Sequence, residues 1–239
     1  MFESKSGVFL IAGLFFFGLA FVVMGYLPIA IYQGEPEKTL DDLAREGILP
    51  EFVQLREQFP DRFQKAYGEV SYASFAAALK RGHRIYVGEG CWHCHSQFIR
   101  PVSNEDLRWG PVSHAREYQN VLQRPVLFGT RRVGPDLIRE GSRKSNDWHL
   151  AHFFKPTSVV PSSVMPEYSW FYDPQGYPNA DGMAIITYVQ WLGSWLSEYP
   201  YWRGEGPAGP TTGGQADPAA GQEVASAALA DPLPAGEPS

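Results

Sequence analysis

The chain has 239 residues, of which 44% are apolar and 19% are charged, and its formal net charge is −6. This length allows one or two domains, and the net acidity without any basic run argues against a nucleic-acid-binding protein. The chain has only two cysteines, which excludes a disulfide-rich scaffold.

The first predicted element is a membrane-spanning helix. No charged residue occurs from Ser6 to Gly34, and about 20 apolar residues are enough to cross a bilayer. A cleaved signal peptide is the alternative, but the apolar run is too long for one and no A-x-A-like cleavage site follows it. We therefore assign residues 1–34 to a single uncleaved transmembrane anchor. Lys5 before the span weakly favours a cytoplasmic N-terminus under the positive-inside rule.

A polar segment follows at residues 35–78, and we interpret it as a helical connector. The sequence from Thr39 is typical of a helix start, and Pro50 and Pro60 indicate breaks between helical pieces of the segment. No residue pattern here indicates chemistry, so we expect the connector to pack on a neighbour.

Residues 79–203 hold both cysteines and all six histidines. We expect helices at about 74–87, 146–154 and 180–198, joined by long proline-containing loops, and we find no run of alternating strand residues. The fold class is therefore mainly α. Because the loops are so long, the domain needs a large group at its centre to bury against.

Residues 204–239 form the last segment, rich in Ala, Gly and Pro and without aromatic residues. This composition cannot bury enough apolar surface to offset the entropy of ordering, so we expect a disordered tail. The tail carries five acids and no base, which leaves the rest of the chain close to neutral. A docking site for a partner must then come from local charge patches.

The sequence Cys91-Trp92-His93-Cys94-His95 is a C-x-x-C-H motif, the attachment signature of c-type haem. Two thiols at this spacing can reach both vinyl groups of one porphyrin edge, and the following histidine then points its imidazole at the iron. The motif predicts thioethers at Cys91 and Cys94 and a proximal iron ligand at His95. Haem is attached outside the cytoplasmic membrane, so this domain must lie on that side.

The two cysteines have three alternative uses. A thioredoxin-like redox pair needs a βαβ context, which is absent, and leaves His95 without a role. A structural disulfide would leave the loops without support. A zinc site could combine Cys91 and Cys94 with His149 and His152, but the spacing differs from that of common zinc sites.

The candidates for the sixth iron ligand are two methionines and three histidines: Met165, Met183, His114, His149 and His152. We assign it to Met165, because a thioether from a loop closing over the haem suits an electron-transfer iron. Met183 lies in an apolar helix, where a core methionine is the expected role.

A proximal histidine needs its second ring nitrogen held by an acceptor, and the Gly134-Pro135 turn could supply a backbone carbonyl. An ordinary turn explains these residues equally well. Four further residues could contact haem propionates or could be solvated: Arg131, Arg132, Arg143 and Trp148.

Four stretches together closely resemble subunit II of cbb3-type cytochrome c oxidases, a membrane-anchored mono-haem cytochrome c. They are Cys91–Pro101, Arg132–Leu137, Asp147–His149 and Ser158–Pro166. The resemblance covers the anchor and about 80–200. It implies a class I cytochrome c-like domain with one covalent haem c, with His95 and Met165 as axial ligands and Pro135 supporting the proximal histidine.

The resemblance also implies a function. Electrons would pass from another c-type cytochrome subunit or a soluble cytochrome c through this haem to haem b of the catalytic subunit I. The protein would lie in the bacterial inner membrane as a single-pass chain, with its haem domain in the periplasm. The chain cannot itself reduce oxygen, because it has one span and no histidine within it. The alternatives are a free-standing membrane-anchored cytochrome c shuttle and the cytochrome subunit of a nitric oxide reductase.

Overall fold

The computed structural model describes residues 5–195. The chain divides into two compact units, Met1–Glu37 and Lys38–Ser239, which are described separately here. The tail predicted at 204–239 and the predicted domain end at 203 lie outside the described residues.

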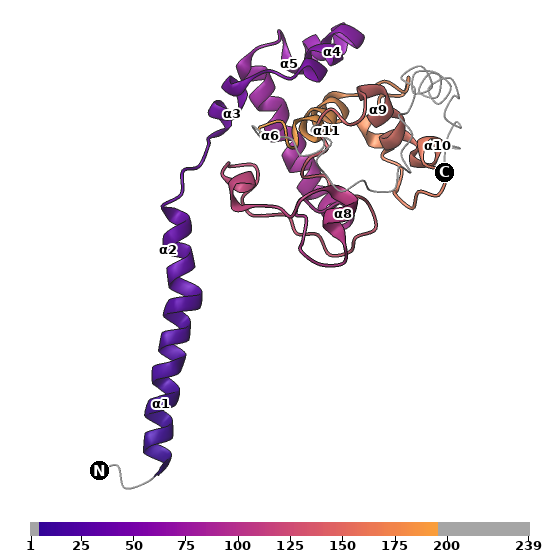
Figure 1. The fold of residues 1–239 in the computed structure, drawn as a ribbon. Helices are drawn as coiled ribbons and strands as arrows, with labels where there is room; N and C mark the ends of the chain where they lie inside the picture. The colour runs from indigo at the N-terminus through magenta and orange to yellow at the C-terminus, as the bar shows by residue number, and fades with distance from the viewer. Residues whose placement is uncertain (1–4, 196–239) are drawn as a thin grey trace, which may run out of the picture. The chain divides into compact units, whose positions relative to one another are not determined.

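The first unit is one apolar helix from Lys5 to Gln33. It consists of α1 (Lys5–Ala20), a short π-helical stretch η1 (Phe21–Tyr26) and α2 (Leu27–Gln33), which continue one another (Figure 1). None of its described side chains is buried. By length and composition this helix can cross a membrane, as the sequence predicted.

The connector forms three short helices, α3 (Leu40–Glu46), α4 (Pro50–Gln58) and α5 (Pro60–Tyr67). Thr39 caps α3 in a reciprocal capping box with Asp42. The other two helices each begin at a proline, because the first helical position needs no backbone N–H. The local sequence thus explains where each of these three helices begins.

Two helices, α6 (Tyr72–Gly88) and α11 (Ala180–Trp191), pack closely against each other at the centre of the second unit (Figure 1). Gly82 makes this approach possible, since a Cβ there would overlap the Ala184 carbonyl oxygen and the Tyr188 Cβ. The sequence predicted α11 to continue to 198, but it ends at Trp191. The chain turns there, and Gly193 takes a φ of +89°.

The connector belongs to the same apolar core as α6 and α11. Phe52 and Phe63 are fully buried, with their ring centroids 4.9 Å apart. Arg62 ties α5 to a distant loop through an ion pair of 2.6 Å with Asp173. The boundary predicted between residues 78 and 79 falls inside α6.

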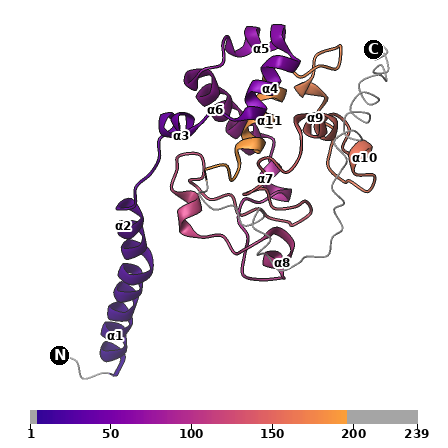
Figure 2. The same cartoon turned by 45° about the horizontal axis from the view of Figure 1, so that its top comes forward.

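Short helices and long loops make up the rest of the second unit. In chain order they are α7 (Cys91–Cys94), α8 (Glu105–Trp109), η2 (Ala115–Tyr118), α9 (Asn146–Phe154), α10 (Pro156–Val159) and η3 (Ser169–Phe171). Both views place α4 and α5 on one side of the central pair and α8 with its loops on the other (Figures 1 and 2). Residues 5–195 contain no β-strand, only two isolated bridges. The mainly α fold class is confirmed.

Candidate functional site

The C-x-x-C-H motif follows the central helix α6 directly. Gly90 adopts a left-handed conformation with a φ of +69°, which turns the chain into the single helical turn α7. Cys91 is half-buried against the main core, whereas Cys94 is exposed, and both are free. Burial raises the pKa of the Cys91 thiol to about 12. A thiol this basic is not the reactive thiolate that a redox C-x-x-C pair requires.

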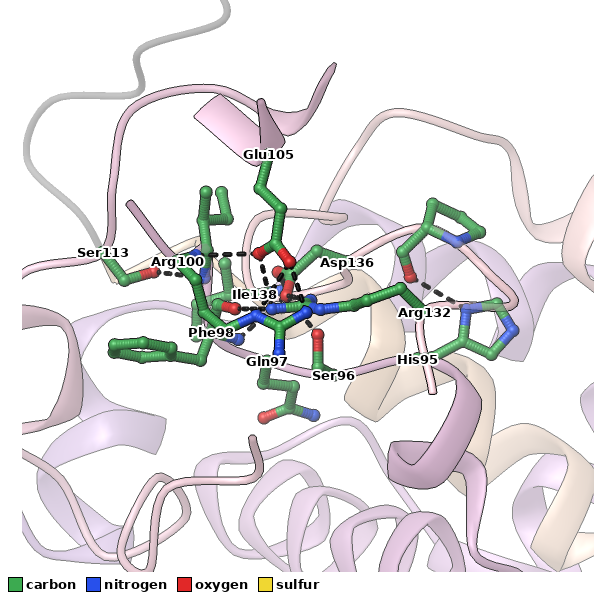
Figure 3. Close-up of polar contacts among 12 residues, drawn as sticks. His95, Ser96, Gln97, Phe98, Arg100, Glu105, Ser113, Arg132, Asp136 and Ile138 are labelled. Atoms are coloured by element: carbon green, nitrogen blue, oxygen red, sulfur yellow. Dashed lines mark hydrogen bonds and ion pairs between the residues drawn. The ribbon is translucent and has the colours of Figure 1, made fainter. Parts of the chain in front are cut away.

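His95 and Pro135, forty residues apart in the sequence, are brought together. The His95 Nδ1 lies 3.0 Å from the Pro135 carbonyl oxygen (Figure 3). Burial lowers the pKa of His95, which favours the neutral imidazole. Because a carbonyl oxygen can only accept, the Nδ1–H donates to it. That leaves the lone pair of Nε2 available to a metal ion. The Tyr86 hydroxyl also donates to the backbone carbonyl of His95.

Met165 lies in the loop between α10 and η3 and packs, half-buried, against the main core. Two contacts join the residues that follow it to the cysteine motif. The Tyr168 side chain lies close enough to the Cys91 thiol for each to affect the pKa of the other. The Trp170 Nε1 donates to the Glu89 carboxylate at 3.2 Å. The methionine loop is therefore anchored beside the two cysteines.

Two histidines of α9 have buried ring nitrogens without a hydrogen-bond partner, namely His149 Nε2 and His152 Nδ1. Burial lowers the pKa of His149 to about 3 and that of His152 to about 4. The charged form of His95 makes a smaller contribution to the lower pKa of His152. The two rings are therefore close enough to interact electrostatically. Buried polar atoms normally have a hydrogen-bond partner. The two unpartnered ring nitrogens are therefore expected if a bound group supplies their partner.

The residues present therefore fit a haem of the c type. One helical turn carries the two thiols, and the adjacent imidazole is held by a carbonyl. A thioether sits in a loop anchored to the same turn. The zinc alternative is not assembled, since no three His, Cys, Asp or Glu side chains gather as metal ligands anywhere in residues 5–195.

Arg132, which the sequence left as a propionate contact or a solvated residue, is not solvated but forms two ion pairs. It pairs with Glu105 at 2.6 Å and with Asp136 at 2.8 Å, and its side chain is only 13% exposed (Figure 3). Sequence reasoning missed this ion-pair network and the hydrogen bond from Tyr86 to the His95 carbonyl. No sequence pattern links Arg132 with Glu105, because 27 residues separate them.

Comparison with protein families finds one matching model, described as cytochrome c oxidase, mono-haem subunit/FixO, over residues 52–179. The match spans the C-x-x-C-H motif, Pro135 and Met165. No curated protein matches the chain.

Proposed function

Because this chain belongs to the FixO family, the mono-haem subunits of cytochrome c oxidase, we propose that it relays electrons through a single covalent haem c to the catalytic subunit of that oxidase. The observation that carries the proposal is the hydrogen bond that holds the His95 imidazole to the Pro135 carbonyl, directly after two free cysteines. When bound, the haem supplies one-electron transfer at a raised potential.

The residue roles follow from the site. Cys91 and Cys94 would attach the haem through thioethers, and His95 Nε2 and the Met165 sulfur would bind its iron. The Pro135 carbonyl fixes the tautomer and orientation of His95. The hydrogen bond from Trp170 to Glu89 holds the chain that follows Met165 beside the residues that precede Cys91.

The proposed partners and location rest on the family and on the apolar helix Lys5–Gln33. The partners are the haem–copper catalytic subunit I and a c-type donor, either another cytochrome subunit or a soluble cytochrome c. The helix anchors the chain in the bacterial inner membrane with the N-terminus in the cytoplasm. This orientation places the second unit in the periplasm, where haem attachment takes place.

Covalent haem is tested by pyridine haemochrome analysis of the purified full chain. We expect one haem per chain for the wild type and none for the double variant Cys91→Ala/Cys94→Ala. His93→Ala is the matched control, since His93 lies in the same motif but is exposed, with its ring stacked on Trp92 and its Nδ1 3.1 Å from the Thr130 hydroxyl. Wild-type protein without covalent haem would overturn the proposal.

The assignment to an oxidase is tested by purification in mild detergent. A haem–copper catalytic subunit that co-purifies and accepts electrons from this chain supports it. A chain that runs alone would instead be a membrane-anchored shuttle. Co-purification with a nitric oxide reductase would identify the related cytochrome subunit.

A further inference from the structure

We propose that Arg132, Glu105, Asp136 and Ser96, here called the Arg132 network, position His95 by holding the Pro135 carbonyl at its Nδ1. None of these four residues binds the haem in this proposal. The inference rests on the proposed function, because it takes His95 to be the proximal iron ligand.

The charged ends of the Arg132 network are paired with one another, whereas the buried Arg132 Nε has no hydrogen-bond partner. Arg132 Nη1 lies 2.8 Å from Asp136 Oδ2, and Arg132 Nη2 lies 2.6 Å from Glu105 Oε2. The side chains of Glu105 and Asp136 are 2% and 0% exposed. Arg132 Nη2 also donates to the Phe98 carbonyl, so one guanidinium joins three separate parts of the chain (Figure 3).

Asp136 connects the two segments that carry the His95–Pro135 hydrogen bond. Its Oδ2 accepts from the Ser96 hydroxyl at 2.6 Å and from the Phe98 N–H at 2.9 Å. Ser96 directly follows His95, and Asp136 directly follows Pro135. A single carboxylate therefore holds the residues next to both partners of the hydrogen bond (Figure 3).

Arg132 is one of several groups that favour the charged form of the two carboxylates in the network. Burial raises the pKa of Asp136, and the Ser96 hydrogen bond, backbone N–H groups and the Arg132 charge oppose that rise. Burial also acts against ionised Glu105, yet hydrogen bonds from Arg100 and the charge of Arg132 lower its pKa overall. Removing one partner from such a buried set leaves uncompensated charge, which favours rearrangement of the segment.

The hydrogen bond to a ligating histidine controls how strongly the imidazole donates to the iron. A firmly held carbonyl makes His95 a better donor, which favours the oxidised iron and keeps the reduction potential lower. Residues that hold the carbonyl therefore influence the potential without touching the haem.

The test uses the full chain with haem attached, in a Met165→Ala background, whose ferrous haem is five-coordinate. In this state the iron–histidine stretching frequency, measured by resonance Raman spectroscopy, reports directly on the His95 hydrogen bond. We expect a downward shift when Ser96→Ala or Arg132→Gln is added. With Met165 intact, Ser96→Ala should raise the reduction potential. Ser96→Ala removes a hydroxyl and no charge. This variant therefore still tests the proposal if Arg132→Gln does not fold.

Arg139→Gln is the matched control. Arg139 and Glu117 form another buried pair at 2.6 Å, with side chains 3% and 6% exposed, and Arg139 also donates to the Pro111 carbonyl. This variant should leave the stretching frequency unchanged. An unshifted frequency in Ser96→Ala, or an equal shift in Arg139→Gln, would overturn the positioning role. Absence of covalent haem from the wild type would instead overturn the proposed function.

Discussion

Gly134 faces the His95 imidazole so closely that a Cβ at position 134 would overlap the ring. We expect Gly134→Ala to displace the imidazole or the Pro135 turn, because neither can give way without weakening their hydrogen bond. The fraction of low-spin haem, measured from the optical spectrum relative to pyridine haemochrome content, should fall.

Gly88→Ala is the control for this substitution. Gly88 lies at the end of α6, and a Cβ there would meet nothing within 4 Å. Its spectrum should match that of the wild type. A wild-type spectrum from Gly134→Ala as well would show that His95 does not bind the iron in the orientation seen here.

Met165 and Met183 differ in burial, and their alanine variants should differ in outcome. Met165→Ala removes the proposed axial thioether, so the haem should become high-spin in its optical and EPR spectra. Met183 is fully buried in α11, so Met183→Ala should lower the free energy of unfolding by roughly 2–5 kcal/mol while the haem stays low-spin. A low-spin spectrum in Met165→Ala would point to a histidine ligand.

Phe52 tests whether the connector is part of the folded domain. Its ring is fully buried against Phe63, Tyr67 and Phe75. Phe52→Ala should therefore lower the free energy of unfolding by roughly 3–5 kcal/mol, measured by denaturant unfolding of the full chain in detergent. Tyr72, which is 53% exposed, is the comparison site, where alanine should change stability by about 0.5 kcal/mol or less. If both variants change the free energy of unfolding by a similarly small amount, the connector is not part of the folded domain.

Glu140 makes stability depend on pH. Burial raises its pKa from the ordinary 4.5 to about 7, against the opposing charges of Arg143 and Lys144. The folded state therefore binds this proton more tightly than the unfolded state. Its contribution to stability is fully present below pH 4.5 and is lost as the pH rises through 7. Glu140→Gln removes this loss, so its advantage over the wild type should grow by up to about 3 kcal/mol between pH 4.5 and 8.

The measurement for Glu140 is the free energy of unfolding of both proteins at pH 5, 6, 7 and 8. Glu57→Gln is the control, since Glu57 is exposed on α4. Its difference from the wild type should stay flat across this range. If the difference in the free energy of unfolding between Glu140→Gln and the wild type also stays constant with pH, the raised pKa of Glu140 is contradicted.

Local features of this protein could be predicted from the sequence because their causes lie within a few neighbouring residues. The C-x-x-C-H spacing, the apolar run from Ser6 to Gly34 and the helix start at Thr39 are of this kind. The family resemblance rested on such short motifs, and the match over residues 52–179 confirms it. The end of α11 was placed too late, because apolar composition alone does not mark where a helix stops.

Contacts between distant segments were decided by the tertiary structure alone. The sequence suggested a Gly-Pro turn for His95 but could not choose it over an ordinary turn, and the fold brings Pro135 to 3.0 Å from the imidazole. Arg132 was open to solvent or a propionate, whereas the structure pairs it with Glu105, 27 residues away. A buried charge needs a partner of opposite sign, and only the folded chain determines which carboxylate is within reach.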